Sequence, residues 1–135
     1  MDTGEYQQAA PQLQPPGGEQ RIWAVLAHLL AVPGNALGLG WVGPLVIWVK
    51  CRRMGPFVTF HALQALLFQL AWTAVVYALV RLDFLLGHVL FYTIVIAGLL
   101  PVAWNVMVAI HAHQGEWYQY PYVGQWAQDL MEPAQ

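Results

Sequence analysis

Charged side chains are scarce in this 135-residue sequence. Asp, Glu, Lys and Arg make up only 9% of the residues, against roughly 25% in an ordinary soluble domain. From residue 22 to residue 112 the charged positions are Lys50, Arg52, Arg53, Arg81 and Asp83. A soluble protein of this size needs a charged surface, so the long uncharged stretches predict an integral membrane protein.

Other residue types are also missing. The sequence contains no serine, which excludes a serine hydrolase. Cys51 is the only cysteine, so no intrachain disulfide can form, and Lys50 and Arg52 on either side are expected to lower its pKa. No basic face exists beyond the short run of Lys50, Arg52 and Arg53, which argues against nucleic-acid binding.

No pattern of catalytic residues appears in the apolar stretches. Asp83 has no second carboxylate beside it for acid–base chemistry. The glycines at 38, 40 and 43 have G-x-G-x-x-G spacing but no βαβ context, so we expect them to permit a tight turn or a close helix approach. We therefore expect a protein that is not an enzyme, with no cofactor and no metal site.

Hydrophobic residues make up 59% of the chain, and their distribution predicts an all-α membrane protein. We expect a disordered polar tail at 1–20, a transmembrane helical domain at 21–115, and an aromatic interfacial segment with a polar tail at 116–135. The helical segments of the domain are expected at about 21–33, 41–51, 56–81 and 84–114.

Two of these segments are long enough to cross a bilayer completely. Phe57–Val80 has 24 uncharged residues, about 36 Å of helix. Phe84–Ala112 is longer still and is expected to tilt or to bend at Pro101. We expect Asn105, four residues further on, to bond with the backbone that the proline frees.

The stretch before them, from residue 22 to residue 49, allows two interpretations. Ile22–Val32 covers only about 17 Å as a helix, and Pro33 and Gly34 then interrupt it. The stretch forms either one kinked crossing or two short helices that enter and leave on the same side. The short lengths favour the hairpin, giving two full transmembrane helices plus an N-terminal hairpin.

The basic turn predicts the orientation. Lys50, Arg52 and Arg53 outnumber the single Arg81 on the other side, so residues 50–55 are expected in the cytoplasm. The C-terminus then lies in the cytoplasm as well, and so does the N-terminus if residues 22–49 form a hairpin.

A few polar side chains fall at membrane depth. Gln64, Gln69 and Asn105 are expected to stabilise helix packing through hydrogen bonds, with the lining of a substrate path as the functional alternative for the glutamines. His28 and His61 are weak candidates for binding a haem or pigment and otherwise pack at an interface.

Further histidines and aromatic side chains mark the end of the last crossing. His111 and His113 could form a metal trio with Glu116 only if the helix continued past Gly115. The aromatic residues that follow suit the lipid headgroup layer. They are Trp117, Tyr118, Tyr120 and Tyr122.

Four stretches together resemble the bacterial Tic-twenty-like family of small helical membrane proteins. They are 19–29 (EQRIWAVLAHL), 43–48 (GPLVIW), 56–66 (PFVTFHALQAL) and 115–121 (GEWYQYP). The plastid relative of that family is a multi-spanning subunit of the inner-envelope import machinery. The resemblance implies four helical segments with both termini on the inner side, and it implies no catalytic residues.

These observations predict a non-enzymatic protein of the bacterial inner membrane that contacts lipids and a membrane-protein partner or a second copy of itself. It would act as an accessory or scaffold subunit of a larger complex. A translocation or channel component is the first alternative and requires a polar lumen built from Gln64, Gln69, Asn105 and Asn35. A haem- or pigment-binding subunit that uses His28 or His61 is the second alternative.

Overall fold

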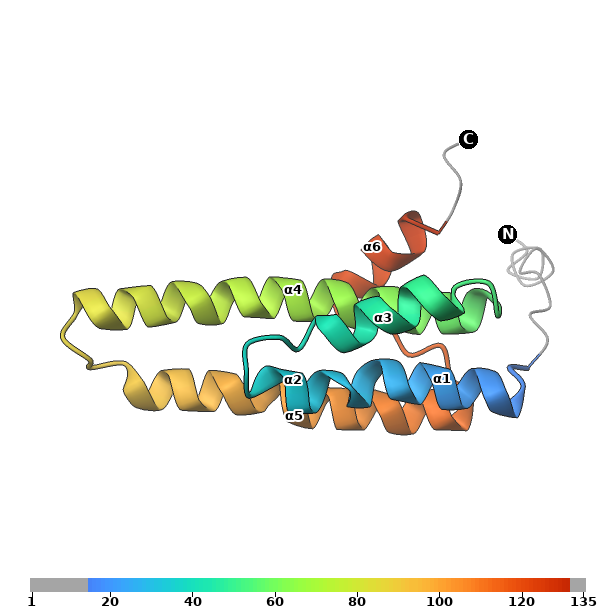
Figure 1. Cartoon of the computed structure of the whole chain (residues 1–135), viewed down its shortest axis with the longest axis horizontal. Helices are drawn as coiled ribbons and strands as arrows, with labels where there is room; N and C mark the ends of the chain where they lie inside the picture. Colours follow the sequence, from blue (N-terminus) through green and yellow to red (C-terminus); the bar gives the residue numbers. More distant parts are fainter. Residues whose placement is uncertain (1–14, 132–135) are drawn as a thin grey trace, which may run out of the picture.

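The computed structural model describes residues 15–131, and the regular elements in this range are all helices. The expected all-α class is therefore confirmed for the described part of the chain, which forms the elements shown in Figure 1. They are α1 (Gly18–Leu29), α2 (Ala31–Asn35), α3 (Val42–Cys51), α4 (Pro56–Leu85), α5 (Phe91–Gln114) and α6 (Val123–Asp129).

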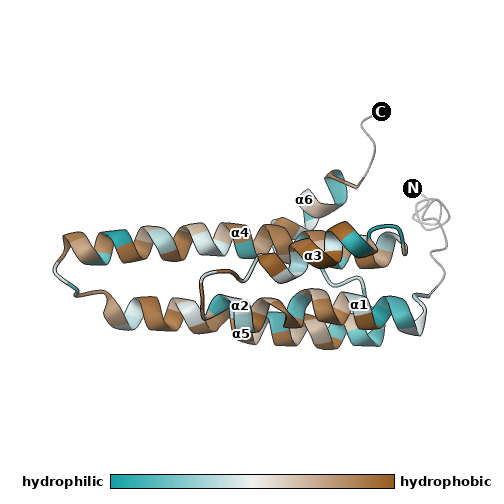
Figure 2. Ribbon diagram, viewed as in Figure 1, coloured by the Kyte–Doolittle hydropathy of each residue, from teal (hydrophilic) through white to brown (hydrophobic). Residues whose placement is uncertain are grey.

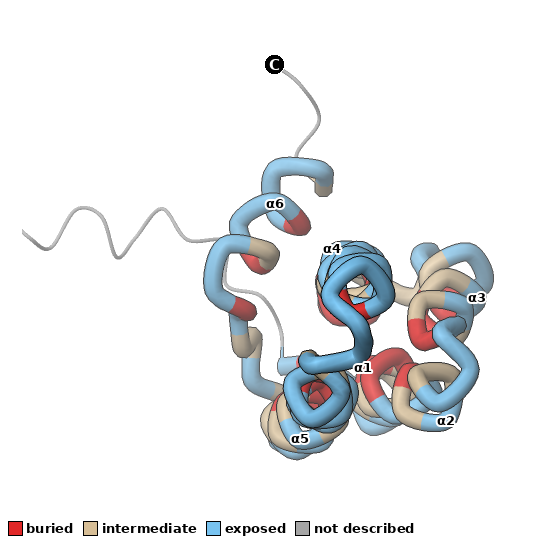
Figure 3. Tube along the Cα trace, turned by 90° about the vertical axis from the view of Figure 1, so that its left-hand side faces the viewer, coloured by how far each residue is buried: buried red, intermediate tan, exposed pale blue. Residues whose placement is uncertain are grey.

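The long helices α4 and α5 form an antiparallel hairpin, and the shorter helices cover only one half of it (Figure 1). Helix α1 packs against both long helices, α3 packs against α4, and α6 lies on α4. The view along the bundle in Figure 3 shows α3 and α6 on different sides of α4. The buried residues are concentrated in this covered half, while the other half projects as two helices alone.

The first third of the described chain is a helical hairpin. Helices α1 and α2 run out along α5, and α3 returns beside α1. The side chain of Gln20, at the start of α1, donates a hydrogen bond of 2.7 Å to the carbonyl of Met54, just after α3. A Cβ added at Gly43 would lie 2.6 Å from the Cβ of Leu30, so α1 and α3 approach closely only because residue 43 is glycine.

Several helix boundaries differ from the expected ones. Helix α1 begins at Gly18, inside the expected tail, while residues 1–14 and 132–135 lie outside the described range. Pro33 and Gly34 do not end the first segment, because α2 contains both and the chain leaves the helix after Asn35. Helix α5 begins at residue 91 rather than 84, because α4 continues to Leu85 and a turn follows.

The C-terminal segment also differs from the expectation. Tyr120 is only 2% exposed, so it lies in the bundle core and not among lipid headgroups. Residues 123–129 form α6, whose Ala127 is fully buried against Phe60 and Leu63. The interfacial position expected for Tyr120 was therefore wrong, because aromatic side chains suit a buried packing surface equally well, whereas Tyr122 is 82% exposed.

Pro101 frees one backbone carbonyl in α5, and α4 satisfies it. A proline has no N–H, so the carbonyl of Ala97 loses its usual helical donor. The indole N–H of Trp72 on α4 donates to that carbonyl at 2.8 Å. Asn105 does bond to the backbone, as expected, but its Nδ2 donates to the carbonyl of Pro101 itself at 2.7 Å.

Helices α4 and α5 are both long and apolar enough to cross a membrane. The 30 residues of α4 extend for about 45 Å, and most of the projecting half of the hairpin is coloured as apolar in Figure 2. Large apolar side chains there face outward, with Leu85 78% and Tyr92 79% exposed. Such a surface suits a lipid environment rather than water.

Cys51 lies inside the covered half and is only 4% exposed. Burial raises the pKa of its thiol, and the neighbouring charge of Lys50 only partly opposes this. The expected lowering of this pKa was therefore wrong, because removal from water outweighs the effect of nearby positive charge.

The orientation can be tested with exposed positions at the two ends of α4. In a Cys51→Ala background, we expect a membrane-impermeant maleimide to label Arg53→Cys only after the cells are opened, because the positive-inside tendency predicts a cytoplasmic basic turn. Leu86→Cys, 51% exposed in the wild-type turn, should be labelled in intact cells. Labelling of Arg53→Cys in intact cells would contradict the orientation.

Candidate functional site

The chain between α5 and α6 runs without regular structure along α4. Helix α5 ends at Gln114, and the next residue, Gly115, has a φ of 84° that reverses the chain direction. Residues 116–120 then pass over the first half of α4. The indole of Trp117 packs edge-to-face on Phe57, with ring centres 5.3 Å apart, and lies 5.4 Å from the ring of Phe60.

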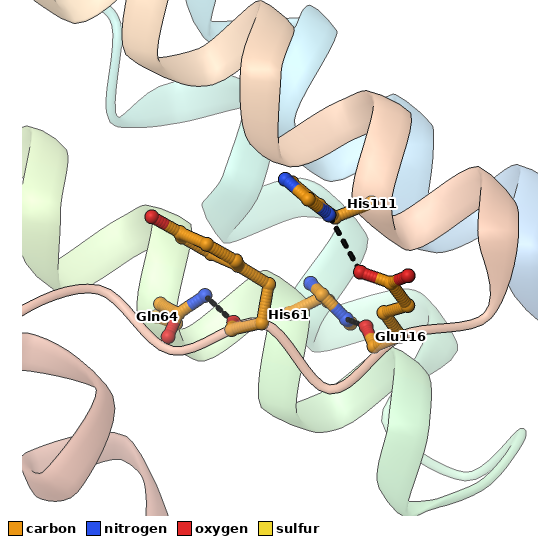
Figure 4. Close-up of polar contacts among 5 residues, drawn as sticks. His61, Gln64, His111 and Glu116 are labelled. Atoms are coloured by element: carbon orange, nitrogen blue, oxygen red, sulfur yellow. Dashed lines mark hydrogen bonds and ion pairs between the residues drawn. The ribbon is translucent and has the colours of Figure 1, made fainter.

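Two side chains one turn apart on α4 bind the backbone of this segment (Figure 4). His61 Nε2 lies 3.1 Å from the carbonyl oxygen of Glu116. Gln64 donates from Nε2 to the carbonyl of Tyr118 at 3.0 Å, and its Oε1 accepts from the backbone N–H of Tyr120 at 2.9 Å. The Gln64 amide thus pairs with the segment as a neighbouring β-strand would, with one donor and one acceptor.

Tyr120 then enters the bundle and joins side chains from three helices. Its hydroxyl lies 3.1 Å from His28 Nδ1 of α1 and donates to Asn105 Oδ1 of α5 at 3.2 Å. His28 Nε2 lies 3.1 Å from His61 Nδ1 of α4. The contacts form one continuous row from the Glu116 carbonyl through His61, His28 and Tyr120 to Asn105, and burial raises the pKa of the Tyr120 phenol.

This row has more hydrogen-bond contacts than hydrogens that can be donated in them. Both ends are acceptors, because the Glu116 carbonyl and Asn105 Oδ1 carry no hydrogen. Between them the neutral forms of His61, His28 and Tyr120 supply one hydrogen each, while the row has four contacts. One contact therefore always lacks its hydrogen in the neutral state. A proton added to His28 would fill it, at the cost of placing a charge on a side chain that is 0% exposed.

The predicted site residues separate into those that the row uses and those that it does not. His28, His61, Gln64 and Asn105 come together as described. Gln69 is 1% exposed, yet neither its Oε1 nor its Nε2 bonds to any residue from 15 to 131, so the expected hydrogen bond is not formed there. The basic residues Lys50, Arg52 and Arg53 are exposed at the turn between α3 and α4.

The geometry gives no support to haem or pigment binding by His28 and His61. Each of their four ring nitrogens faces a partner at 3.1 Å, so none points into free space. Tyr120 lines an apolar cavity of about 290 Å³ together with Phe68, Trp72 and Trp104, and neither imidazole lines it.

The residues at the end of α5 form a pair rather than a metal trio. His111 Nδ1 lies 2.6 Å from a carboxylate oxygen of Glu116, because Gly115 turns the chain back (Figure 4). His113 does not join them, and within residues 15–131 no group of three His, Cys, Asp or Glu side chains is placed to hold a metal.

Sequence reasoning missed Tyr120 as the residue that closes the row. One signal was available: Tyr120 precedes Pro121, which predicts extended backbone for the tyrosine. Extended backbone that is buried among helices needs partners from those helices. The unpaired polar groups of Gln64 and His61 on α4 were the obvious candidates for that role.

A family model described as the magnetosome magnetite crystal formation protein family (MamF/MmsF) matches residues 19–127. This match corrects the resemblance to the Tic-twenty-like family, which was wrong. No curated protein matches the chain, and no solved structure matches it. The match begins at the start of α1 and ends within α6, so it includes every residue of the hydrogen-bonded row.

The two glutamines of α4 provide a matched pair of variants. Gln64→Met leaves the carbonyl of Tyr118 and the N–H of Tyr120 without partners, so we expect a loss of about 2–4 kcal/mol in the free energy of unfolding. Gln69→Met removes an amide that has no partner in the described part of the chain, and it should change that free energy by less than about 0.5 kcal/mol or raise it. Thermal unfolding in detergent, followed by circular dichroism, would measure both. Equal effects would contradict the role of Gln64.

The hydrogen shortage of the row predicts a tautomer change. Tyr120→Phe leaves two contacts for the two imidazole hydrogens, so we expect His28 and His61 to become single Nε2–H tautomers. The wild-type row should populate more than one tautomer, because the empty contact can move along it. Nitrogen-15 NMR of labelled histidines in detergent distinguishes the forms, with Tyr118→Phe as the control. Identical histidine signals in wild type and Tyr120→Phe would show that the row does not lack a hydrogen.

Proposed function

The chain belongs to the magnetosome magnetite crystal formation protein family, and we propose that it serves crystal formation as a non-enzymatic, multi-pass membrane protein. It would act by contacts between helices, with lipids and with a membrane-protein partner or a second copy of itself. The observation that carries this proposal is the projecting half of the α4–α5 hairpin, which is apolar and has no other helix of the described chain packed on it.

The outer surface of α5 supports a role in contact. Its exposed apolar side chains recur every three or four residues, so they form a stripe along the helix. The stripe includes Tyr92, Ile96, Leu99, Val106 and Ile110, which are each at least 42% exposed.

The turn between α4 and α5 offers little for binding iron. The carboxylate of Asp83 already accepts from the backbone N–H of Leu90 and lies 3.1 Å from His88 Nδ1.

The buried row supports a structural rather than a catalytic task. His28, His61 and Asn105 are 0% exposed and Tyr120 is 2% exposed, so a substrate has no route to them in this conformation. The row joins α1, α4, α5 and the segment before α6. We infer that it holds the covered half together as a rigid base for the projecting hairpin.

The geometry favours this function over a channel. A polar lumen between copies would need Gln64 and Asn105 to face outward. Both instead point inward and bond within the chain, to the backbone of residues 118 and 120 and to Pro101 and Tyr120. Two of the four residues expected to line a lumen therefore offer no polar surface for a translocation or channel role.

The basic turn supports an orientation with both described ends in the cytoplasm. Gln20 bonds to Met54, so the start of α1 lies beside the turn that carries Arg52 and Arg53. The positive-inside tendency places that end in the cytoplasm. The turn at residues 86–90 would then lie on the opposite side of the membrane.

Tryptophan substitutions in a magnetite-forming cell would test the proposal. Lipid accommodates an added indole on an exposed position, whereas a packed protein contact does not. In a strain that lacks this gene, we expect the wild-type chain to restore crystals. Along the stripe, at Tyr92, Ile96 and Leu99, we expect at least one tryptophan variant to give smaller or fewer crystals at an unchanged protein level, as measured by electron microscopy.

Val75 on α4, 46% exposed, provides a control position on the other helix of the hairpin. Normal crystals with every variant would contradict a function through helix contacts. Failure of the wild-type chain to restore crystals would contradict the role in crystal formation itself.

A further inference from the structure

We propose that the groove between the basic turn and the end of α6 binds the phosphate headgroup of an anionic phospholipid. The groove has a volume of about 580 Å³, which falls within the range of small-molecule binding sites. Residues from α3, α4 and the end of α6 line it. They are Trp48, Arg52, Arg53, Thr59, Leu63, Leu130 and Met131.

Two arginines supply the positive charge of this groove. The guanidinium of Arg52 lies over the indole of Trp48, 5.6 Å from the ring centre, which holds it at the wall of the groove. Neither Arg52 nor Arg53 forms an ion pair with a carboxylate of residues 15–131. An arginine fork pairs well with phosphate oxygens, because its N–H groups match their spacing.

The other polar groups near the groove either form hydrogen bonds within the chain or face solvent, so they compete little with a phosphate for the arginines. The hydroxyl of Thr59 points back to the turn before α4, where the carbonyls of Arg52 and Gly55 lie 2.8 and 3.0 Å away, so it orders the arginines rather than the ligand. Asp129 on α6 and Glu19 on α1 are the described carboxylates on the neighbouring helices, and both are exposed to solvent. The charge of the groove itself is therefore positive.

The rest of the lining is apolar, which favours a lipid over a free phosphate ion. Leu63 forms part of the wall, and Leu130 remains 66% exposed beside Met131. The groove opens close to the start of α4, one of the two helices that can cross a membrane. A phospholipid at that membrane face would place its phosphate on the arginines and its glycerol and first methylene groups on these side chains.

Native mass spectrometry of the full chain can test this proposal. The protein would be released from nanodiscs of equimolar phosphatidylcholine and phosphatidylglycerol, and the retained lipid would be identified. We expect retention of phosphatidylglycerol in preference to phosphatidylcholine. Arg52→Gln and Arg53→Gln should each lower that retention by about fivefold.

Lys50→Gln is the matched control, because it removes one charge from the same turn but does not line the groove. Lys50→Gln should retain phosphatidylglycerol as the wild type does, and excess glycerol phosphate in solution should not displace the lipid. The proposal would be overturned by equal losses in all three variants, by no preference for phosphatidylglycerol, or by displacement with glycerol phosphate, which would indicate a site for free anions.

Discussion

The bonds from α4 to the extended segment before α6 are the constraint on which the structure depends. A stretch of chain without helix leaves its backbone groups unpaired, and such groups are costly away from water. Gln64 satisfies two of them, the carbonyl of residue 118 and the N–H of residue 120, and His61 Nε2 lies within hydrogen-bond distance of a third, the carbonyl of residue 116. The segment can therefore lie inside the bundle, and Tyr120 can reach helices α1 and α5.

The position of Tyr120 then determines how the helices relate to one another. Its hydroxyl links α1 and α5 through His28 and Asn105, while its ring packs 4.8 Å from Phe68 of α4. Polar contacts of this kind are directional, so they specify one arrangement among several that apolar packing alone would allow. This specificity distinguishes the covered half from the projecting half, where apolar surfaces restrict the arrangement of the helices less.

Sequence reasoning predicted the helical class and the two long helices because they depend on local composition. Uncharged stretches of sufficient length at 57–80 and 84–112 identify such helices without any knowledge of partners. The row of His28, His61, Tyr120 and Asn105 could not be predicted in the same way, because it joins residues as many as 92 positions apart. Gln64 and Gln69 show the same limit, because Gln64 bonds to the C-terminal segment, whereas Gln69 has no partner among residues 15–131.

The bond from Trp72 to the carbonyl of Ala97 determines how the α4–α5 hairpin can change in length. It connects the interior of α4 to the point in α5 that Pro101 leaves without a donor, 25 residues further along the chain. The rotational setting of the two helices is thereby fixed from within the hairpin rather than by the connecting turn. Insertions or deletions near residues 86–90 would change how far the tip extends while leaving the facing surfaces of α4 and α5 in register.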